Sequence, residues 1–349
     1  MTTAIQRPTF ARAEKLAHPA HRLLAVPILL ALVIAPPVLP AQPGGKSDPT
    51  PRLFAPYVDM SLTSAEDLAA IQKRTGLRAV TLAFLSSAGG HCAVGWEGLK
   101  QALPNDKLPN GASVQELVRA LHRSGVQVIL ALGGQSGTEP ALVCRSQPAL
   151  ESLYRSLMDR YGVTMLDFDI EGKGATDRAS IDRRNQALAA LQQSNPALRV
   201  TYTLEAMPTG LVDSGLNLLA SAARAGLAVD VVNLMAMDYG SAVDHRAAMG
   251  SYAIQAASAA QKQLQTAGIK SAIGITVMIG ANDEKPEVFT AADAQAVLDF
   301  ARKNANVKQL SIWSLARDNG HCPGRKSAAA DCSGIQQRDF EFSTTFAHF

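Results

Sequence analysis

Three acidic residues occupy every second position near the end of one apolar stretch, residues 162–172, which reads Gly-Val-Thr-Met-Leu-Asp-Phe-Asp-Ile-Glu-Gly. Successive side chains of a β-strand point to opposite faces, so Asp167, Asp169 and Glu171 share one face while the apolar residues between them share the other. Carboxyl groups gathered on a buried strand oppose one another's ionisation, which keeps a proton on one of them at neutral pH. The pattern therefore predicts a general acid; a surface strand with solvated acids and a calcium site are the alternatives.

Short apolar runs alternate with longer amphipathic stretches through the rest of the chain. Strands are predicted at 54–60, 79–84, 126–132, 163–170, 199–204, 231–237, 272–278 and 309–314. Helices are predicted at 64–75, 114–124, 148–161, 181–194, 214–225, 252–267, 291–304 and 335–346. Such repeated pairs with near-continuous apolar strands predict an α/β fold, one parallel (β/α)8 TIM barrel over residues 52–349. The alternative, a doubly wound open sheet, lacks its Gly-x-Gly-x-x-Gly turn after the first strand.

Acids and aromatic residues gather where these strands end, which is where a (β/α)8 barrel builds its active site. The predicted site residues are Tyr57, Phe84, Gly134, Gln135, Asp169, Glu171, Tyr202, Met235, Met237, Asp238, Tyr239 and Trp313. Aromatic faces suit the apolar side of a sugar ring, and acids suit its hydroxyls and glycosidic oxygen, so we predict a carbohydrate site. For Trp313 and the methionines, the alternative to a role in the site is packing in the barrel core. For Asp238 the alternative is capping of the next helix. Asp59 and Glu205 also end strands; for Glu205 the alternative is an exposed loop acid, which is commonplace.

The composition is that of an ordinary globular protein. Of its 349 residues 47% are hydrophobic and 18% charged, and the net charge is only +3. Part of the basic excess lies in the first 22 residues. We therefore expect no nucleic-acid partner.

The first 41 residues have the features of a secretory signal peptide. Basic residues precede an apolar run at 23–39, which is interrupted by prolines, is short for a membrane span and ends at a small-residue site, Ala41. A Pro- and Gly-rich linker follows at 42–51. We expect a secreted or periplasmic protein with no stable membrane association after cleavage; an uncleaved N-terminal anchor is the alternative.

The four cysteines agree with an oxidising compartment. Cys92 and Cys144 lie in two loop regions, while Cys322 and Cys332 bracket a short segment rich in Pro, Gly and Ala. Of the three pairings that four cysteines allow, we predict 92 with 144 and 322 with 332. A zinc site is the alternative, but no Cys-x-x-Cys spacing supports it, so no metal is predicted.

These motifs resemble glycoside hydrolase family 18, the chitinase family, over the whole barrel. The family's strand-four signature, Asp-x-x-Asp-x-Asp-x-Glu, is similar to the segment that carries Asp167, Asp169 and Glu171, with Thr164 at the first Asp position. The family's Ser-x-Gly-Gly and Met-x-Tyr-Asp motifs are similar to Ala131-Leu132-Gly133-Gly134 and Met235-Ala236-Met237-Asp238. Trp313 falls where the family keeps a tryptophan under the reacting sugar.

The resemblance implies a retaining, substrate-assisted hydrolysis of β-1,4-linked N-acetylglucosamine in chitin or chitooligosaccharides. Glu171 would protonate the glycosidic oxygen, Asp169 would orient the acetamido group that attacks the anomeric carbon, and Asp167 would tune Asp169 from behind. Such chemistry needs no cofactor and no metal. Because Met237 replaces the usual tyrosine, we expect Tyr239 or Tyr202 to supply the missing hydroxyl.

Two other functions stay open. An endo-β-N-acetylglucosaminidase that cuts N-glycans would use the same residues. A non-catalytic chitin-binding lectin on the same barrel would typically lack the acid, and Glu171 is present. In each case the partner is a polysaccharide or oligosaccharide that contains N-acetylglucosamine, and we expect a monomer.

Overall fold

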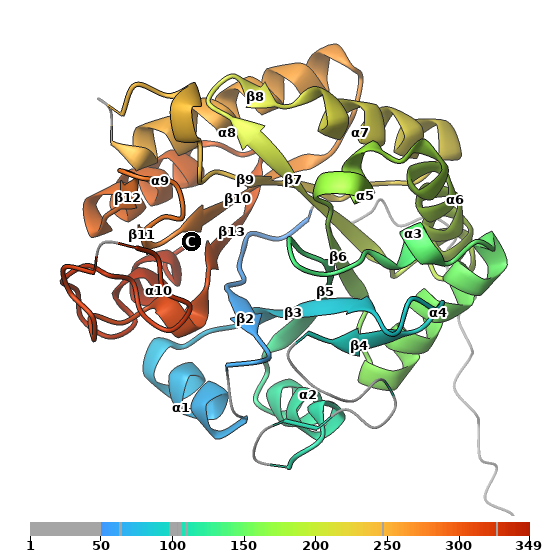
Figure 1. Cartoon of the computed structure of the whole chain (residues 1–349), viewed down its shortest axis with the longest axis horizontal. Coiled ribbons are helices and arrows are strands. Elements are labelled where there is room, and N and C mark those ends of the chain that lie inside the picture. Colours follow the sequence, from blue (N-terminus) through green and yellow to red (C-terminus); the bar gives the residue numbers. More distant parts are fainter. Residues whose placement is uncertain are drawn as a thin grey trace, which may run out of the picture. The chain divides into compact units, whose positions relative to one another are not determined.

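The computed structural model describes residues 50–62, 65–97, 103, 107–108, 111–245, 248–325 and 327–349. The predicted signal peptide and nearly all of the linker lie outside these residues. Residues 48–349 form one compact unit by themselves. In the described part of this unit a ring of parallel strands is surrounded by helices (Figure 1).

Parallel strands form the ring in the order β1, β13, β10, β9, β7, β6, β5, β3, β2. Their bounds are β1 (Leu53–Phe54), β2 (Tyr57–Asp59), β3 (Ala79–Ser87), β5 (Gln127–Gly133), β6 (Met165–Asp169), β7 (Arg199–Met207), β9 (Val231–Met235), β10 (Ala272–Met278) and β13 (Val307–Trp313). The first barrel strand is split into β1 and β2 at Pro56, because proline has no N–H group for the ladder. β1 pairs with β13 and β2 pairs with β3, so the split strand closes the ring. The predicted (β/α)8 barrel is confirmed.

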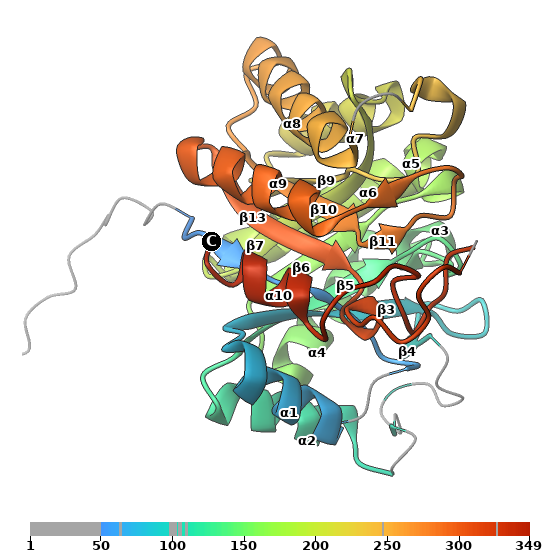
Figure 2. The same ribbon diagram turned by 90° about the vertical axis from the view of Figure 1, so that its left-hand side faces the viewer.

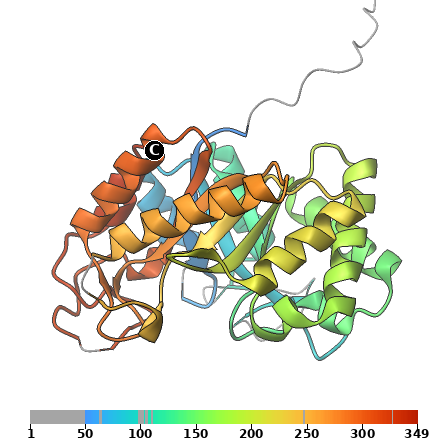
Figure 3. The same ribbon diagram turned by 90° about the horizontal axis from the view of Figure 1, so that it is seen from above.

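Helices follow the strands in turn and cover the outside of the ring, as Figures 2 and 3 show from two further directions. The main helices are α1 (Ala65–Thr75), α2 (Val114–Arg123), α4 (Gln147–Tyr161), α6 (Arg178–Ser194), α7 (Asp213–Ala225), α8 (Met249–Thr266), α9 (Ala291–Lys303) and α10 (Glu341–Phe346). Shorter elements interrupt the alternation: α3 (Pro140–Val143), α5 (Gly172–Thr176), β4 (Val94–Trp96), β8 (Gly210–Leu211), β11 (Gly280–Ala281), β12 (Val288–Phe289), and the 3-10 turns η1 (Gly240–Ala242) and η2 (Leu315–Arg317).

Local sequence signals fix several helix ends. Thr290 and Asp293 form a reciprocal capping box at the start of α9, which satisfies backbone N–H groups that have no partner within the helix. Gly162 ends α4 in the left-handed conformation, with φ of 64°. The last helix is shorter than predicted. The Asp318 carboxylate accepts hydrogen bonds from the backbone N–H groups of Phe342 and Ser343, so the helical turn begins there and not near residue 335.

The two faces of β6 are those that the alternation predicts. Phe168 faces the helices, where its ring centroid lies 5.2 Å from that of Tyr154. Asp167 and Asp169 face the inside of the ring and are both buried. The strand thereby places two carboxyl groups in the barrel interior, where they lose their hydration and their charged forms become less favourable.

Candidate active site

A cavity of about 450 Å³ opens at the carboxyl ends of the strands. This volume is within the range of small-molecule sites. Predicted site residues that line it are Tyr57, Phe84, Gln135, Asp169, Glu171, Met235, Met237, Asp238 and Trp313. The structure therefore brings together predicted side chains from six of the strand ends and the loops after them.

A buried hydrogen-bond network lies beneath the cavity. The Tyr57 hydroxyl donates to Oδ2 of Asp167 at 2.7 Å, and the Thr203 hydroxyl donates to Oδ1 of Asp167 at 2.7 Å. The Asn233 amide donates to Thr203 at 2.9 Å and to Thr276 at 2.7 Å. Because the network joins five strands, the position of Asp167 is determined by the barrel as a whole.

Burial changes the acidity of Asp167. Removal from water raises its pKa from 3.8 to about 6, and the hydrogen bonds from Tyr57 and Thr203 oppose this rise. The carboxyl group therefore changes its charge close to neutral pH.

Asp169 and Glu171 act as one pair. Burial raises the pKa of Asp169 well above its usual value, and the nearby charges of Glu171 and Asp167 raise it further. Burial also raises the pKa of Glu171, while a hydrogen bond from Asp169 lowers it. Two carboxyl groups joined in this way hold one proton between them. Oδ1 of Asp169 is buried and has no hydrogen-bond partner among the described residues.

Three aromatic rings form a platform on one side of these acids, which we name the aromatic platform: Tyr57, Phe84 and Trp313. The Phe84 and Trp313 rings are stacked at 5.5 Å with an interplanar angle of 27°. Tyr57 meets Trp313 edge-on, with ring centroids 6.0 Å apart. Trp313 is only partly buried, so a face of the platform is open to the cavity. Such a face suits the apolar side of a sugar ring.

Two glycines make this arrangement sterically feasible. A Cβ atom on Gly133 would lie 2.0 Å from the carbonyl oxygen of Asp169, and one on Gly134 would lie 2.7 Å from the Phe84 ring. Both residues have positive φ, 105° and 83°. Gly134, predicted to contact substrate, is not part of the cavity lining. It instead allows Phe84 to pack closely and donates a backbone hydrogen bond of 3.1 Å to Asp169.

Tyr202 lies elsewhere than predicted. It pairs with Phe168 in the sheet, faces the helices and is fully buried. Its hydroxyl donates to the side chain of Asn185 and receives a hydrogen bond of 3.4 Å from Arg184. The assignment of Tyr202 to the substrate site is therefore corrected to a packing role between β7 and α6.

Tyr239 is also outside the cavity lining. Its ring packs against Tyr252 at 5.9 Å, and its hydroxyl is buried without a hydrogen-bond partner among the described residues. Its backbone N–H donates to Glu287 at 3.1 Å, which holds the loop after β9 in place. We therefore correct the assignment of Tyr239 as a catalytic residue. Neither tyrosine supplies a hydroxyl beside Met237.

Thr164 occupies the position of the first Asp in the family's strand-four signature. It is exposed, precedes β6 and offers only its carbonyl oxygen to Arg199 of β7, at 2.8 Å. Its exposure explains why a change at this position of the motif leaves the interior network intact.

The sequence pattern missed several residues of the lining, which come from loops, from the middle of strands and from the end of β7. They are Glu97, Ser136, Thr203, Ala206, Met207, Thr276, Asp283 and Glu284. Asp59 and Glu205, noted only as strand-end acids, also line the cavity. The lining thus carries eight carboxyl groups and no Lys, Arg or His within the described part of the chain. Burial raises the pKa of Glu97 and that of Asp238.

Both predicted disulfides are present, Cys92 with Cys144 and Cys322 with Cys332. Over the described residues no group of three or more metal-ligating side chains could hold a metal ion. None of the helices in the described ranges is both long and apolar enough to span a membrane.

An acidic cavity with an aromatic platform at the mouth of a (β/α)8 barrel defines the class of sugar-cleaving barrel enzymes. No protein-family model matches the chain. The chain is 33% identical over 317 residues to a probable bifunctional chitinase/lysozyme of Escherichia coli, covering 85% of this chain and 34% of that protein. It is 33% identical over 284 residues to endochitinase 11 of Metarhizium anisopliae, covering 76% of this chain and 52% of that protein. The chain thus matches about a third and about half of the length of these curated relatives.

Among solved structures, the catalytic domain of a hyperthermophilic chitinase from Pyrococcus furiosus is similar over nearly its whole length. The TM-score is 0.73 and the identity 30%, with 86% of this chain and 97% of that domain covered. The chain therefore belongs to the chitinase family, glycoside hydrolase family 18.

Proposed function

We propose that this chain is a glycoside hydrolase that cleaves β-1,4-linked N-acetylglucosamine in chitin or chitooligosaccharides with retention of configuration. One observation carries the proposal: the paired acids Asp169 and Glu171 lie beside the aromatic platform, and Oδ1 of Asp169 is a buried acceptor without a partner. An acetamido N–H group on a sugar held against Trp313 would satisfy that acceptor. A related Pyrococcus furiosus chitinase domain has been solved with chito-oligosaccharides.

The bond changes follow from these positions. Glu171 gives its proton to the glycosidic oxygen, and the C1–O bond breaks as the substrate's own acetamido oxygen bonds to C1. Asp169 accepts the acetamido N–H and stabilises the positive charge of the resulting oxazolinium. Water then attacks C1, the bond between C1 and the acetamido oxygen breaks, and the water gives its proton to Glu171, which restores the enzyme and the acetamido group.

Asp167 supports this step indirectly. It does not line the cavity, but its charge raises the pKa of Asp169. When Asp167 is ionised, its negative charge favours the form of the pair in which Asp169 carries the shared proton. Positive charge that develops near Asp169 favours the ionised form of Asp169, so the proton then moves to Glu171.

The charge of the cavity supports a neutral substrate. Eight carboxyl groups without a basic residue in the described lining disfavour an acidic polysaccharide, whereas chitin carries no negative charge. Met237 leaves no tyrosine hydroxyl at its position. Besides Tyr57 and Trp313, the neutral hydrogen-bonding side chains of the lining are Gln135, Ser136, Thr203 and Thr276.

Product analysis tests the proposal. The purified chain is incubated separately with chitin oligomers and with an N-glycoprotein, alongside a Glu171→Gln variant. The proposal is supported if the wild type cleaves the oligomers to β-anomers and the Glu171→Gln variant does not cleave them. Trimming of the glycoprotein alone would assign an endo-β-N-acetylglucosaminidase instead, and binding of oligomers without cleavage would assign a lectin.

We also infer that the protein is secreted or periplasmic and monomeric. The signal-like leader and two disulfides support export. Among the described residues the exposed large hydrophobic side chains are only Leu62 and Val288, which argues against an extensive apolar interface. N-terminal sequencing of the exported protein tests the cleavage after Ala41, and light scattering tests the mass in solution.

A further inference from the structure

A short antiparallel hairpin outside the barrel repeat, β3–β4, is fixed in three ways. β4 pairs with the end of β3. The disulfide between Cys92 and Cys144 joins the hairpin loop to the end of α3. The Trp96 indole N–H donates to the hydroxyl of Tyr161 in α4 at 2.9 Å, and both side chains are buried. The hairpin therefore holds the residue that follows it, Glu97, at a defined position.

The Glu97 side chain forms part of the wall of the active-site cavity. The Glu97 backbone N–H donates to the carbonyl oxygen of Phe84, a member of the aromatic platform, at 2.9 Å. The Glu97 carboxyl group is hydrogen-bonded to the side chain of Ser86. A Cβ atom on Gly137 would lie 2.0 Å from Oε1 of Glu97, so glycine at position 137 leaves room for the carboxyl group. Contacts on several sides thus determine where this carboxyl group lies.

The charge of Glu97 acts on both members of the Asp169–Glu171 pair. Burial is the largest cause of the raised pKa of each, and the negative charge of Glu97 raises both pKa values further. Burial also raises the pKa of Glu97 itself, and the hydrogen bond with Ser86 opposes that rise. Charges that are partly removed from water are weakly screened. An ionised Glu97 therefore favours the protonated form of the pair.

The other charged groups that surround the pair are also acids. Besides burial, the charge of Asp167 raises the pKa of Asp169. Glu205 and Asp238 likewise add to the effect of burial on the pKa of Glu171. The remaining titratable groups of the lining are Tyr57, Asp59, Asp283 and Glu284, and no Lys, Arg or His lines the cavity within the described ranges. No neighbouring cation of the described lining thus offsets the negative charge of Glu97.

We propose that Glu97 is a positioning residue for the shared proton: its fixed negative charge keeps that proton on the Asp169–Glu171 pair as the pH rises. The inference rests on the proposed function, because the retained proton is the one that Glu171 gives to the glycosidic oxygen. Without the charge of Glu97 the pair would lose its proton at lower pH. The hairpin thereby extends the pH range in which the general acid is protonated.

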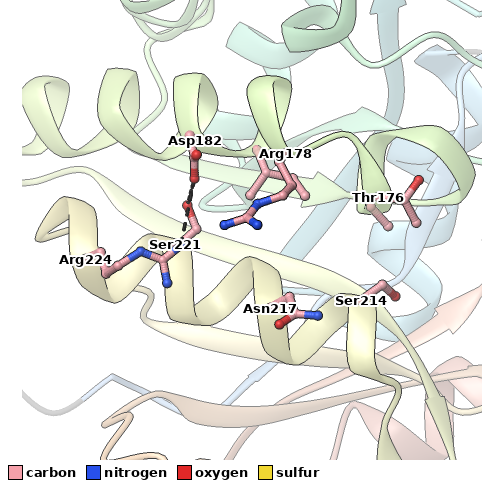
Figure 4. A pocket seen from close by; sticks show the side chains of 9 residues that line it. Thr176, Arg178, Asp182, Ser214, Asn217, Ser221 and Arg224 are labelled. Atoms are coloured by element: carbon pink, nitrogen blue, oxygen red, sulfur yellow. Dashed lines mark hydrogen bonds and ion pairs between the residues drawn. The ribbon is translucent and has the colours of Figure 1, made fainter.

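A carboxylate elsewhere on the barrel offers a matched control. Asp182 lines a hollow of about 420 Å³ beside α6 and α7 (Figure 4), which shares no lining residue with the active-site cavity. Like Glu97, Asp182 is half-buried and bonded to a serine, because the Ser221 hydroxyl donates to it at 2.6 Å. Asp182→Asn thus removes one negative charge and one charged partner of a serine, but outside the active site.

Profiles of kcat/KM against pH on chitin oligomers test the inference in the full chain. We expect the alkaline limb of Glu97→Gln to lie about 0.3 to 1 pH unit below that of the wild type, and that of Asp182→Asn to coincide with the wild type. Glu97→Asp keeps the charge on a shorter side chain, so its limb should lie between the two. A limb of Glu97→Gln that coincides with the wild type would overturn the inference. An equal loss of rate at every pH would also overturn it, and would make Glu97 a substrate contact instead.

Titration without substrate separates this inference from the proposed function. ¹³C NMR of protein labelled at its glutamate carboxyl groups follows Glu171, whose signal is identified by its loss in Glu171→Gln. A lower midpoint for Glu171 in Glu97→Gln than in the wild type supports the inference even if the wild type cleaves no oligomer, in which case only the hydrolase proposal fails. An unchanged midpoint overturns the inference whatever the activity of the wild type.

Discussion

The Tyr57 hydroxyl lies 2.7 Å from Oδ2 of Asp167, although 110 residues separate the two in the chain. Tyr57 comes from the first barrel strand and Asp167 from β6, so the contact crosses the interior of the ring. The same tyrosine ring belongs to the aromatic platform. Tyr57 thereby joins the aromatic platform to the buried acids. Displacement of the platform therefore affects the acids, and displacement of the acids affects the platform.

The raised pKa of Asp167 predicts a pH-dependent effect on stability. The folded carboxyl group holds its proton more tightly than the unfolded one, so its contribution is full below pH 3.8 and is lost as the pH rises to about 6. At 1.36 kcal/mol per pKa unit the loss is about 3 kcal/mol. Asp167→Asn does not titrate, so its free energy of unfolding relative to the wild type should rise by about 3 kcal/mol between pH 4 and pH 8.

Chemical denaturation of both proteins across this pH range measures the difference. A constant offset between them reflects altered hydrogen bonding to Tyr57 and Thr203 and does not affect the test. A difference that stays constant over the whole range would contradict the raised pKa of Asp167.

Glu171→Gln should lower kcat by about 10²- to 10⁴-fold, the usual contribution of a general acid, without loss of folding. The wild type should lose activity on the alkaline side as Glu171 gives up its proton. Because burial raises the pKa of Glu171, this loss should occur at higher pH than for an ordinary glutamate. Rate profiles against pH measure both effects. The matched control is Glu151→Gln, on the surface of α4, and equal rates for the two variants would refute the role of Glu171.

The sequence predicts the interior acids because their placement depends on a local alternation. The same alternation could have corrected Tyr202, since Glu205 lines the cavity and Thr203 points inward, which leaves Tyr202 on the outer face. Tyr239 was different, because it lies beyond the end of β9 and its position depends on a hydrogen bond to Glu287, 48 residues away. Residue type and a position near the end of a predicted strand suggested a site role for both tyrosines.

The loop acids of the cavity had no comparable signal. Glu97 follows β4, a short antiparallel strand that pairs with β3 and does not belong to the barrel repeat. Asp283 and Glu284 lie in the connection between β11 and β12. Loops of this kind have no periodicity, so tertiary contacts alone decide which of their side chains reach the site.

Gly134→Ala should weaken substrate binding through Phe84. The added Cβ would lie 2.7 Å from the ring, at a φ of 83° that alanine rarely adopts. We expect a loss of about 1–3 kcal/mol in stability from the backbone and a raised KM from displacement of Phe84 against Trp313. Gly111→Ala is the matched control, because Gly111 has a φ of 85° and nothing within 4 Å of the added atom. If both variants change KM equally, the steric role of Gly134 is wrong.

Tyr239→Phe should leave kcat and KM unchanged. The hydroxyl is buried without a partner among the described residues, so its removal should leave stability equal to that of the wild type or raise it by up to about 1 kcal/mol. Tyr57→Phe is the informative counterpart, because that hydroxyl bonds to Asp167 and Thr203 and its loss should lower both stability and activity. Steady-state kinetics and thermal denaturation of the pair measure this contrast. Slow turnover in Tyr239→Phe would restore that tyrosine to the site.

The two disulfides should contribute unequally to stability. Cys92–Cys144 spans 52 positions of the chain and Cys322–Cys332 spans 10. In the chain-entropy account the longer loop loses more freedom when it is closed, which gives about 4 kcal/mol for the first and about 3 kcal/mol for the second. Replacing each pair by serines and measuring unfolding in guanidinium chloride compares the two. The first disulfide also joins the β3–β4 loop to the end of α3, close in sequence to Glu97, so its removal should raise KM as well. A larger loss of stability from the Cys322–Cys332 pair would show that native contacts, and not the length of the closed loop, decide how much each disulfide stabilises the barrel.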